Sequence, residues 1–458
     1  MDVLKETNDN QGRLSRRAFL QGLSALGGSL AVLSACGAQP AAEAKPTSAP
    51  AAGEAKGNEA AKLSGTLNVL TLGGGIFGLP FTDEKVKGEW GKLYPDVKIN
   101  NITLGYDEAI KKYAAAFAAG SGEYDVVQID YIFCAGFAKA GHLVPLNDIL
   151  GSWFDDFKKD TSEGAIAGYT LDGVTYGLPT IGNCQRFIYN KAILEKEGLQ
   201  PPDTWDQLLE ISKKVHKPDK NQYAFAAGVE RLVKAAGIWL PIFWSNGGEL
   251  FDKGWHPTVN TDAGVQSLEY LIELVEYMPP GGANFTEADE IKAMGSGTTV
   301  FEPFAWIPDA ITNASVPEVA QQLETKVQPK GSVRNSPVMG GLGLVVPKYS
   351  KNQEAALEYV KWYNSADVQK NLIIPAGGQP CRTSAWEANL NAQPYFKGLL
   401  ENLKVAKVRP GIPEYGAVDG AIGLQMSRAF NKEVTSKEAL DEAQKEIEKI
   451  MKDAGYYS

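Results

Sequence analysis

Histidine is scarce in this sequence, and the common motifs of hydrolytic enzymes are missing. Three histidines, His142, His216 and His256, occur in 458 residues, and their spacing does not match that of a zinc site. Neither G-x-S-x-G nor H-E-x-x-H occurs, so the signals of an α/β-hydrolase nucleophile and of a zinc protease are absent. We therefore expect no metal, no cofactor and no catalytic residue, and the chain is predicted not to be an enzyme.

The sequence also has few cysteines, no excess of positive charge and no long, strongly apolar run. Four cysteines exclude a disulfide-dense scaffold. The formal net charge of −10 argues against nucleic acid or an anionic membrane surface as a partner. The apolar run 18–35 is diluted by glycine and serine, whereas a membrane-spanning helix needs about 20 strongly apolar residues. The run is therefore predicted to belong to an export signal.

The N-terminus carries two export motifs in register. Residues 15–20 (SRRAFL) resemble a twin-arginine signal, and 33–36 (LSAC) resemble the lipobox of bacterial lipoproteins. These motifs predict that 1–35 is a signal peptide and that Cys36 receives a lipid. The mature protein would then be extracytoplasmic and anchored to the cell membrane. A plain cleaved signal followed by an incidental cysteine is the alternative.

A low-complexity segment follows the lipobox. Alanine, proline, glycine, glutamate, lysine and serine dominate it, so it buries too little apolar surface to offset the entropy of ordering. Together with Cys36 it is predicted to form a flexible linker over 36–64. Such a linker would let a folded body search near the membrane for a partner.

The body begins with alternating strands and helices. Strands are expected at 66–72, 97–104 and 124–129, and helices at 83–94, 107–118 and 133–140. This order predicts a mainly parallel sheet covered by helices on both faces. Ligands bind such sheets beyond the carboxyl ends of the strands.

Turn and capping signals place the later elements. Asp172-Gly173 predicts a hairpin turn, and Thr204 with Gln207 predicts a capping box at a helix start. The remaining expected elements are strands at 186–190 and 338–347 and helices at 235–244, 263–277, 353–364 and 436–454. A chain of this length exceeds one hydrophobic core, so two lobes are expected.

Residues 73–78 spell G-x-G-x-x-G after a strand. A dinucleotide site is one interpretation. It is disfavoured because no acidic residue ends the next strand and because export separates the protein from cytosolic cofactors. A Gly-rich turn that lets backbone amides approach another ligand is favoured, with Gly75 and Phe77 near it.

The sequence is rich in tryptophan, with nine residues. Trp239 and Trp244 precede a Gly-rich break at 246–248, and Trp306 follows a break at Pro303. Aromatic faces beside amides and carboxylates suit a pyranose or polyol, whose C–H faces are apolar and whose edges form hydrogen bonds. Packing in the core is the alternative for each tryptophan.

Six short segments carry a family resemblance by their order and spacing. They are GSGEYDVV (120–127), FAKAG (137–141), LVPL (143–146), DGVTYGLP (172–179), IYNK (188–191) and PDTWDQL (202–208). Together they resemble the bacterial extracellular solute-binding proteins of family 1. These are sugar-binding lipoproteins of ABC importers, similar to maltodextrin-binding proteins. The resemblance covers nearly all of residues 65–458.

The resemblance implies an α/β fold like that of the type II periplasmic binding proteins, with two α/β lobes joined by crossing hinge strands. Lobe 1 would comprise 65–180 plus 340–383, and lobe 2 would comprise 181–339 plus 384–458. Cys184 and Cys381 would then lie near the hinge, either as a disulfide or as buried free thiols.

The resemblance also implies a set of ligand contacts. Asn183 stands where maltodextrin-binding relatives place a carboxylate, and Trp306 where they stack a tryptophan on sugar. Asp419 stands where they place an aromatic residue, which implies a smaller ligand. The ligand-binding residues expected from sequence and resemblance are Gly75, Phe77, Tyr106, Asp130, Tyr131, Asn183, Trp239, Trp244, Trp306, Gly341, Arg382, Tyr415 and Asp419.

The function implied is capture of a sugar or sugar alcohol and its delivery to the permease subunits of an ABC importer. The protein is expected to act as a monomer, without nucleic acid as a partner. One alternative is an extracellular carbohydrate-active enzyme, since paired carboxylates can be far apart in sequence. Another keeps the fold but binds a polyamine, metal chelate or peptide.

Overall fold

The structure is a computed structural model that describes residues 63–73, 75–229 and 233–458. All of these residues lie in one compact unit, Ala61–Ser458. The expected signal peptide 1–35, the lipid attachment site Cys36 and nearly all of the linker 36–64 lie outside the described residues.

The first sheet has five strands in the order β2-β1-β3-β13-β6. Its strands are β1 (Gly65–Leu72), β2 (Val97–Leu104), β3 (Val126–Asp130), β6 (Gly177–Pro179) and β13 (Leu342–Val345). β1 pairs in parallel with β2 and β3, as the alternating order predicts, whereas β13 runs antiparallel to β3 and β6. The late strand β13 thus returns to a sheet formed mainly by the start of the body.

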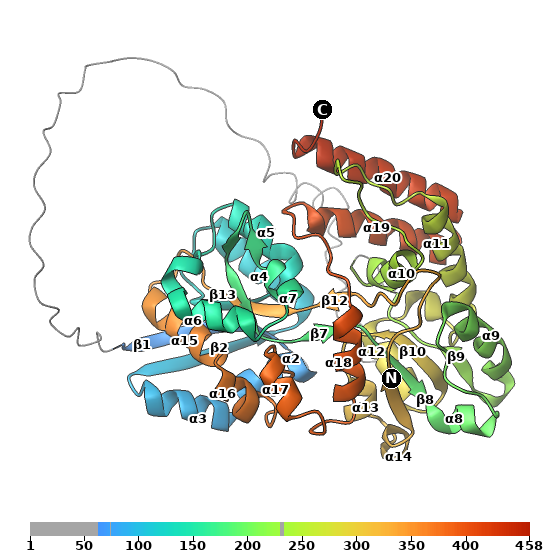
Figure 1. The fold of residues 1–458 in the computed structure, drawn as a ribbon, viewed down its shortest axis with the longest axis horizontal. Coiled ribbons are helices and arrows are strands. Elements are labelled where there is room, and N and C mark those ends of the chain that lie inside the picture. The colour runs from blue at the N-terminus through green and yellow to red at the C-terminus, as the bar shows by residue number, and fades with distance from the viewer. Residues whose placement is uncertain (1–62, 74, 230–232) are drawn as a thin grey trace, which may run out of the picture. The chain divides into compact units, whose positions relative to one another are not determined.

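Helices cover this sheet in the left half of Figure 1. They are α2 (Gly75–Thr82), α3 (Glu84–Leu93), α4 (Tyr106–Ala118), α5 (Tyr131–Lys139), α6 (Asn147–Lys159), α7 (Glu163–Ala167), α15 (Gln353–Tyr363), α16 (Ala366–Val368) and the π-helix η3 (Gln369–Ile373). The carboxylate of Asp83 caps α3 by accepting from two backbone amides. A core that includes Trp90, Phe154 and Tyr363 joins several of these helices to the sheet. We call this sheet and its helices the first lobe.

The second sheet has four strands in the order β11-β8-β10-β9. They are β8 (Arg186–Asn190), β9 (Tyr223–Phe225), β10 (Thr299–Ala305) and β11 (Leu323–Lys326). The sequence analysis did not predict β10, because Pro303 argues against a central strand. The structure accommodates this proline at an irregularity in the β10–β8 pairing between Glu302 and Ala305.

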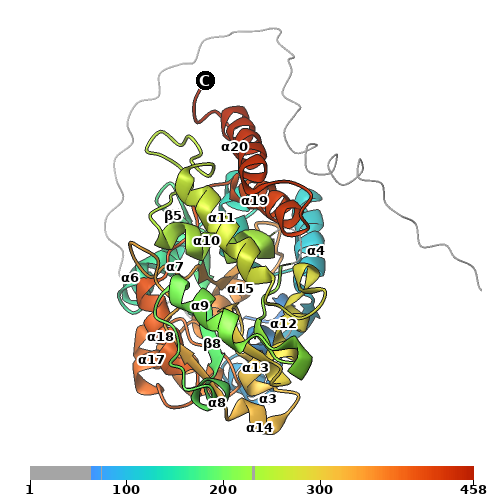
Figure 2. The ribbon, with the colours of Figure 1, turned by 90° about the vertical axis from the view of Figure 1, so that its right-hand side faces the viewer.

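A larger set of helices belongs to the second sheet (Figure 2). They are α8 (Lys191–Lys196), α9 (Trp205–Val215), η1 (Pro218–Lys220), α10 (Val233–Ser245), α11 (Asp262–Val275), η2 (Gly282–Asn284), α12 (Glu287–Gly295), α13 (Asp309–Thr312), α14 (Pro317–Ala320), α17 (Thr383–Ala388), α18 (Phe396–Val405), α19 (Tyr415–Phe430) and α20 (Ser436–Asp453). The capping box of Thr204 and Gln207 is confirmed at the start of α9. We call this sheet and its helices the second lobe.

Three chain segments run side by side between the two sheets. β7 (Asn183–Cys184) pairs antiparallel with β12 (Met339–Gly340). The backbone of Lys407 then joins β12, since its carbonyl accepts from Met339 N at 2.8 Å and its amide donates to Pro337 O at 2.8 Å. The resemblance predicts crossing strands at the first two places, and the Lys407 segment adds a third strand-like neighbour.

The two sheets fall on either side of these crossings, and the predicted lobe boundaries at 180, 340 and 383 stay a prediction. The hairpin predicted at Asp172-Gly173 is present, with β4 (Thr170–Leu171) paired to β5 (Val174–Thr175) and both turn residues at positive φ. Cys134, Cys184 and Cys381 are buried free cysteines. Of the two alternatives for the Cys184 and Cys381 pair, the structure therefore has free thiols. These two side chains belong to different hydrophobic clusters.

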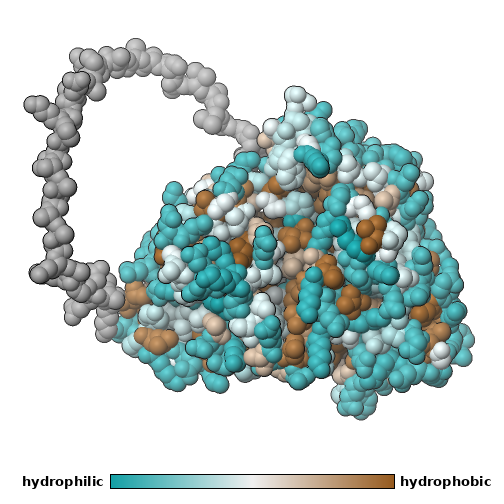
Figure 3. Space-filling model, in the orientation of Figure 1, coloured by the Kyte–Doolittle hydropathy of each residue, from teal (hydrophilic) through white to brown (hydrophobic). Residues whose placement is uncertain are grey.

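Hydrophilic side chains cover most of the face drawn in Figure 3, with hydrophobic ones scattered among them. Among the described residues, no helix combines the length and the apolar character needed to cross a membrane.

Candidate functional site

The first-lobe side of the candidate site lies where two parallel strands end. β3 ends at Asp130, whose carboxylate caps α5 by accepting from Ile132 N at 3.3 Å. Tyr106, the first residue of α4, follows β2 and donates its hydroxyl to Asp130 Oδ2 at 2.9 Å. Both residues were predicted, because ligands bind beyond the carboxyl ends of such strands. Burial raises the pKa of Asp130, and the nearby Arg409 opposes this shift.

Arg409 stands at the centre of the candidate site, and the sequence analysis missed it. Its side chain is only 2% exposed, and Nη2 lies 3.7 Å from Asp130 Oδ1. Its Nε donates to the Tyr131 hydroxyl at 3.0 Å, and that hydroxyl donates to the carbonyl of Met339 in β12 at 2.9 Å. Burial alone lowers the pKa of Arg409, but Tyr131 and Asp130 outweigh it and raise the pKa well above its usual value. The guanidinium is therefore a fixed positive charge.

Three aromatic rings surround the Arg409 guanidinium. Its Cζ lies 5.1 Å from the ring centre of Tyr131, 5.7 Å from that of Trp306 and 6.0 Å from that of Tyr415. Cation–π attraction at these distances holds the cation in place. Tyr131 belongs to α5 of the first lobe, whereas Trp306 follows β10 and Tyr415 begins α19 in the second lobe. The Arg409 side chain therefore contacts both lobes.

A second buried carboxylate, Asp419, also lies near this cation. Tyr415 donates its hydroxyl to Asp419 Oδ1 at 3.0 Å, and both side chains are fully buried. Burial raises the pKa of Asp419 to about 6, against the opposing effect of Arg409. Both residues were predicted as ligand contacts. A direct contact with the ligand stays a prediction for both, and in the structure they contribute to the electrostatic environment of the Arg409 guanidinium.

The second-lobe side of the site is formed by Trp306 and Asn183. Trp306 is half-buried and directly follows β10. Asn183 lies in the crossing strand β7, and its Oδ1 accepts from Arg186 Nη2 at 2.6 Å. A Cβ atom at Gly340 would stand 2.8 Å from Trp306 Cζ3 and 3.3 Å from Asn183 Nδ2. The missing side chain at Gly340 therefore lets the two predicted contacts meet at the hinge.

Three further predicted residues lie on the first-lobe side. The carbonyl of Gly341 accepts from Tyr131 N at 3.3 Å. Phe77 is half-buried and packs with Tyr106 against the small cluster that contains Ile181. Gly75 begins α2, so the expected Gly-rich turn is shorter than predicted. The structure thus brings most of the predicted residues to one region around Arg409.

Three other predicted residues do not join this group. Trp239 and Trp244 are buried core residues of α10, where Trp239 stacks on Phe243 at 4.3 Å. The core alternative holds for both, because α10 is packed on all sides rather than on one face. Arg382 pairs with Asp160 at 3.2 Å and lies over Phe157 at 4.9 Å, so it braces the first lobe.

The described residues offer no cluster of histidine, cysteine, aspartate or glutamate that could hold a metal ion. At the G-x-G-x-x-G motif, a Cβ atom at Gly78 would stand 2.9 Å from the carbonyl of Leu72. Close packing of α2 on β1 therefore accounts for Gly78 without a dinucleotide.

Sequence reasoning missed two arginines, Arg409 and Arg186. Arg409 lies in an irregular segment, 406–414, which offers no periodicity to place it. Arg186 was read only as the first residue of a strand. The available signal for Arg186 was a charged residue in a strand predicted to be central and therefore buried, which is unusual without a structural or functional reason.

Comparison with known proteins matches residues 79–370 to the family described as "Bacterial extracellular solute-binding protein". A relative from Sinorhizobium fredii, named "Probable amino-acid ABC transporter periplasmic-binding protein", is 28% identical over 381 residues, which are 79% of this chain and 84% of the relative. A "Mannitol-binding protein" from Pseudomonas aeruginosa is 24% identical over 79% of this chain and 88% of its own.

A solved structure of maltose-bound MalE3 from T. maritima superposes with a TM-score of 0.75 and 25% identity, covering 83% of this chain and 98% of the other. The predicted fold class, that of a two-lobed type II periplasmic binding protein, is thereby confirmed.

Proposed function

This chain belongs to the bacterial extracellular solute-binding proteins, and from that premise we propose that it captures a sugar or sugar alcohol and delivers it to an ABC importer. The family consists of solute-binding proteins rather than enzymes. Relatives are named for mannitol and for arabinooligosaccharides. The proposal assigns a ligand of this chemical class to the site around Arg409.

The observation that carries the proposal is the polar and aromatic group around the buried Arg409. Asp130 and Tyr106 supply a carboxylate and a hydroxyl from the first lobe, and Trp306 supplies a half-buried indole from the second. A polyhydroxylated ligand needs hydrogen-bonding edges and an apolar face. This group offers both, and it offers them from both lobes.

Capture would proceed by closure of the lobes over the ligand. A ligand that contacts both lobes binds the closed form more tightly and shifts the population toward it. The crossing segments β7 and β12 are short and lie beside the site, so a small change in their backbone angles would swing the lobes. The closed form would then dock on the permease.

We further propose that a lipid on Cys36 tethers the protein outside the cytoplasm, as the motifs at 15–20 and 33–36 indicate. The linker to residue 64 would let the folded body reach a permease in the same membrane. The protein is proposed to serve as a monomer.

Thermal unfolding of the mature protein against a ligand panel tests the proposal. The panel contains D-mannitol, ribitol, D-tagatose, L-arabinose, maltose and a mixture of amino acids. A ligand at 100 times its Kd stabilises the native state by about 2.7 kcal/mol and raises the melting temperature. A rise with a sugar or polyol, followed by calorimetric titration, is the expected result.

Two results would contradict the proposal. A rise only with amino acids would change the ligand class while keeping the family. Release of shortened sugars during long incubation with maltose would indicate an enzyme.

A further inference from the structure

Arg186, the first residue of β8, is a charged residue buried without a salt bridge in the described part of the chain. Its side chain is fully buried, and burial lowers its pKa, although Tyr395 and the nearby carboxyl groups of Glu302 and Asp309 oppose this shift. Its Nε and Nη1 have no hydrogen-bond partner among the described residues. Such a cation costs free energy to bury, and an apolar residue of similar volume would often be as stable or more stable. Stability alone therefore does not account for an arginine here.

The bonds that Arg186 does form lead to two predicted ligand contacts. Nη2 donates to Asn183 Oδ1 at 2.6 Å and to the carbonyl of Trp306 at 3.0 Å. Nη2 carries two hydrogens, so each acceptor can take one. One nitrogen thus connects the crossing strand β7 to the residue that follows β10.

These two bonds fix the chemistry that Asn183 offers. An arginine only donates hydrogen bonds, so the atom of Asn183 that faces it must be the oxygen. The remaining group, Nδ2, is then a donor, and it lies on the side of Gly340 and the Trp306 ring. Without Arg186 the amide could turn over and present an acceptor instead.

We infer that Arg186 is a positioning residue for the ligand: it orients the Asn183 amide as a donor and holds Trp306 in place beside it. The inference rests on the proposed function, because it assigns Arg186 a role at the same site. Bracing of the second lobe is the competing explanation, since the guanidinium also lies over the ring of Tyr395 at 5.5 Å.

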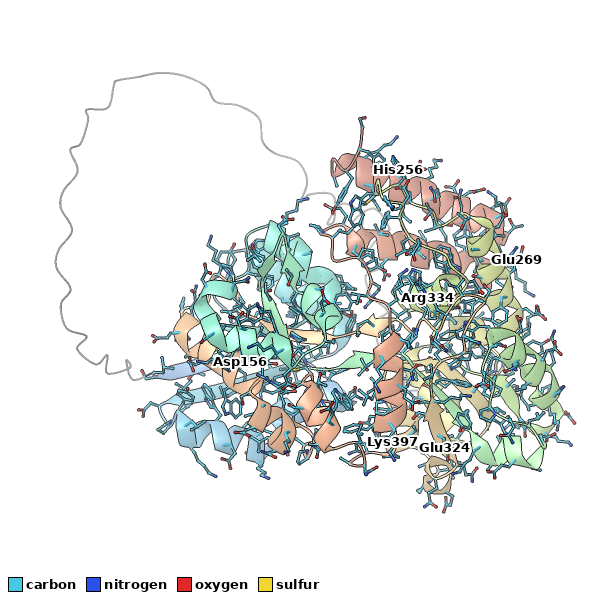
Figure 4. The ribbon with its side chains drawn as sticks, in the orientation of Figure 1. Asp156, His256, Glu269, Glu324, Arg334 and Lys397 are labelled. Atoms are coloured by element: carbon cyan, nitrogen blue, oxygen red, sulfur yellow. The ribbon has the colours of Figure 1, made fainter. Side chains whose placement is uncertain are left out.

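The first test needs no ligand. Tryptophan is replaced by 5-fluorotryptophan, and the fluorine resonance of Trp306 is assigned with a Trp306→Phe variant. Arg186→Met should shift or broaden this resonance while those of Trp90 and Trp205 stay in place. Arg334→Met is the matched control, because Arg334, labelled in Figure 4, is exposed and forms an ion pair with Glu249. An unmoved Trp306 resonance in Arg186→Met would overturn the inference.

The second test is a double-mutant cycle with D-mannitol, or with maltose if only maltose binds in the panel. Arg186→Met should weaken binding about tenfold or more, the worth of a hydrogen bond to a charged group. In a Trp306→Ala, Asn183→Ala background it should add little, because the two side chains that it positions are already gone. Equal losses in both backgrounds would show that Arg186 acts elsewhere and would overturn the inference.

Failure of Arg186→Met to fold and failure of the wild type to bind a sugar can each be told apart from failure of the inference. If Arg186→Met does not fold, Arg186→Lys replaces it in both tests, since a lysine keeps the charge but cannot reproduce the two bonds of Nη2 in the same geometry. If the wild-type protein binds no sugar or polyol, the proposed function fails, and the fluorine experiment still decides whether Arg186 positions Trp306.

Discussion

At the scale of single residues, Trp306 differs from the other two rings around Arg409. Tyr131 and Tyr415 are enclosed, with at most 3% of their surface exposed, whereas Trp306 is half-buried. One face of its indole is occupied by the Arg409 guanidinium. Of the three rings, Trp306 is therefore the one with side-chain surface left for a ligand.

We expect Trp306→Ala to weaken binding of the panel ligand by about 1–3 kcal/mol, the worth of a well-packed aromatic contact. Calorimetric titration beside a melting curve measures both effects. The control is Trp255→Ala, because Trp255 is also partly exposed but packs against Phe251 and Tyr456. If the affinity is unchanged and the free energy of unfolding falls by about 3–5 kcal/mol, as for a truncated core residue, Trp306 is part of the core and does not contact the ligand.

The buried carboxyl group of Glu302 is expected to make the stability of the fold depend on pH. Its carboxylate is buried in β10, and both oxygens lack a hydrogen-bond partner among the described residues. Burial, with a further contribution from Glu290, raises its pKa well above the usual value. The folded state therefore favours the protonated acid. The stability this contributes is present below the pKa of the unfolded chain and is lost as pH rises through the folded pKa.

Glu302→Gln keeps the shape but cannot ionise. We expect its melting temperature, relative to wild type, to rise as pH increases from 5 to 8, because only the wild type pays for ionisation. Glu269→Gln is the control, since Glu269 is exposed on α11 (Figure 4). Parallel pH profiles for wild type and Glu302→Gln would contradict the prediction.

The sequence located part of this site by general rules and part by resemblance. Asp130 could be predicted because it ends a parallel strand, and Trp306 because of its place in the family pattern. Trp239 was misassigned because a tryptophan before a Gly-rich break looks the same in a core as in a site. Arg409 was missed because its partners, Asp130 and Trp306, are far from it in sequence.

At the scale of elements, the crossing strand β12 depends on Gly340. A side chain there would overlap the Trp306 ring and crowd the Asn183 amide. Gly340→Ala should therefore displace the indole, destabilise the fold by about 1–3 kcal/mol through overpacking and weaken ligand binding. Chemical denaturation and titration measure the two effects.

Gly88→Ala is the matched control, because a Cβ atom at Gly88 in α3 would meet nothing within 4 Å. It should stabilise the fold by about 0.5–1 kcal/mol. In a Trp306→Ala background the cost of Gly340→Ala should shrink, since the overlapping ring is gone. An equal cost in both backgrounds would mean that backbone strain, not Trp306, sets the penalty.

Strands and helices with a clean period were predicted well, and the strand β2 matches its predicted bounds. Two features of the sheets required the structure. β10 contains a proline, which local rules exclude from a central strand. β13 joins the first sheet antiparallel after a long excursion of the chain through the second lobe, and a local pattern carries no signal for such a pairing.

At the scale of the whole molecule, length predicted two lobes, and the family resemblance supplied their arrangement. α5 of the first lobe and α19 of the second also meet directly, where Lys139 pairs with Glu414 at 3.1 Å. Glu414 also accepts from the Tyr456 hydroxyl at 2.9 Å. The Lys139–Glu414 ion pair is partly exposed and is worth little on its own, whereas side chains of both helices belong to one hydrophobic cluster.

The proposed lipid anchor depends on the thiol of Cys36. Cys36→Ala should leave the precursor without a lipid, and the protein should leave the membrane fraction and fail to incorporate labelled palmitate, because the lipid is attached through that thiol. Replacing Arg16 and Arg17 with lysine is the companion change, since it should block export and leave an unprocessed precursor with Cys36 intact. A Cys36→Ala protein that still sediments with membranes and carries label would remove the lipid from the proposal. The proposed capture of a solute would still stand, because the contacts that support it join Arg409 to Asp130, Tyr131 and Trp306.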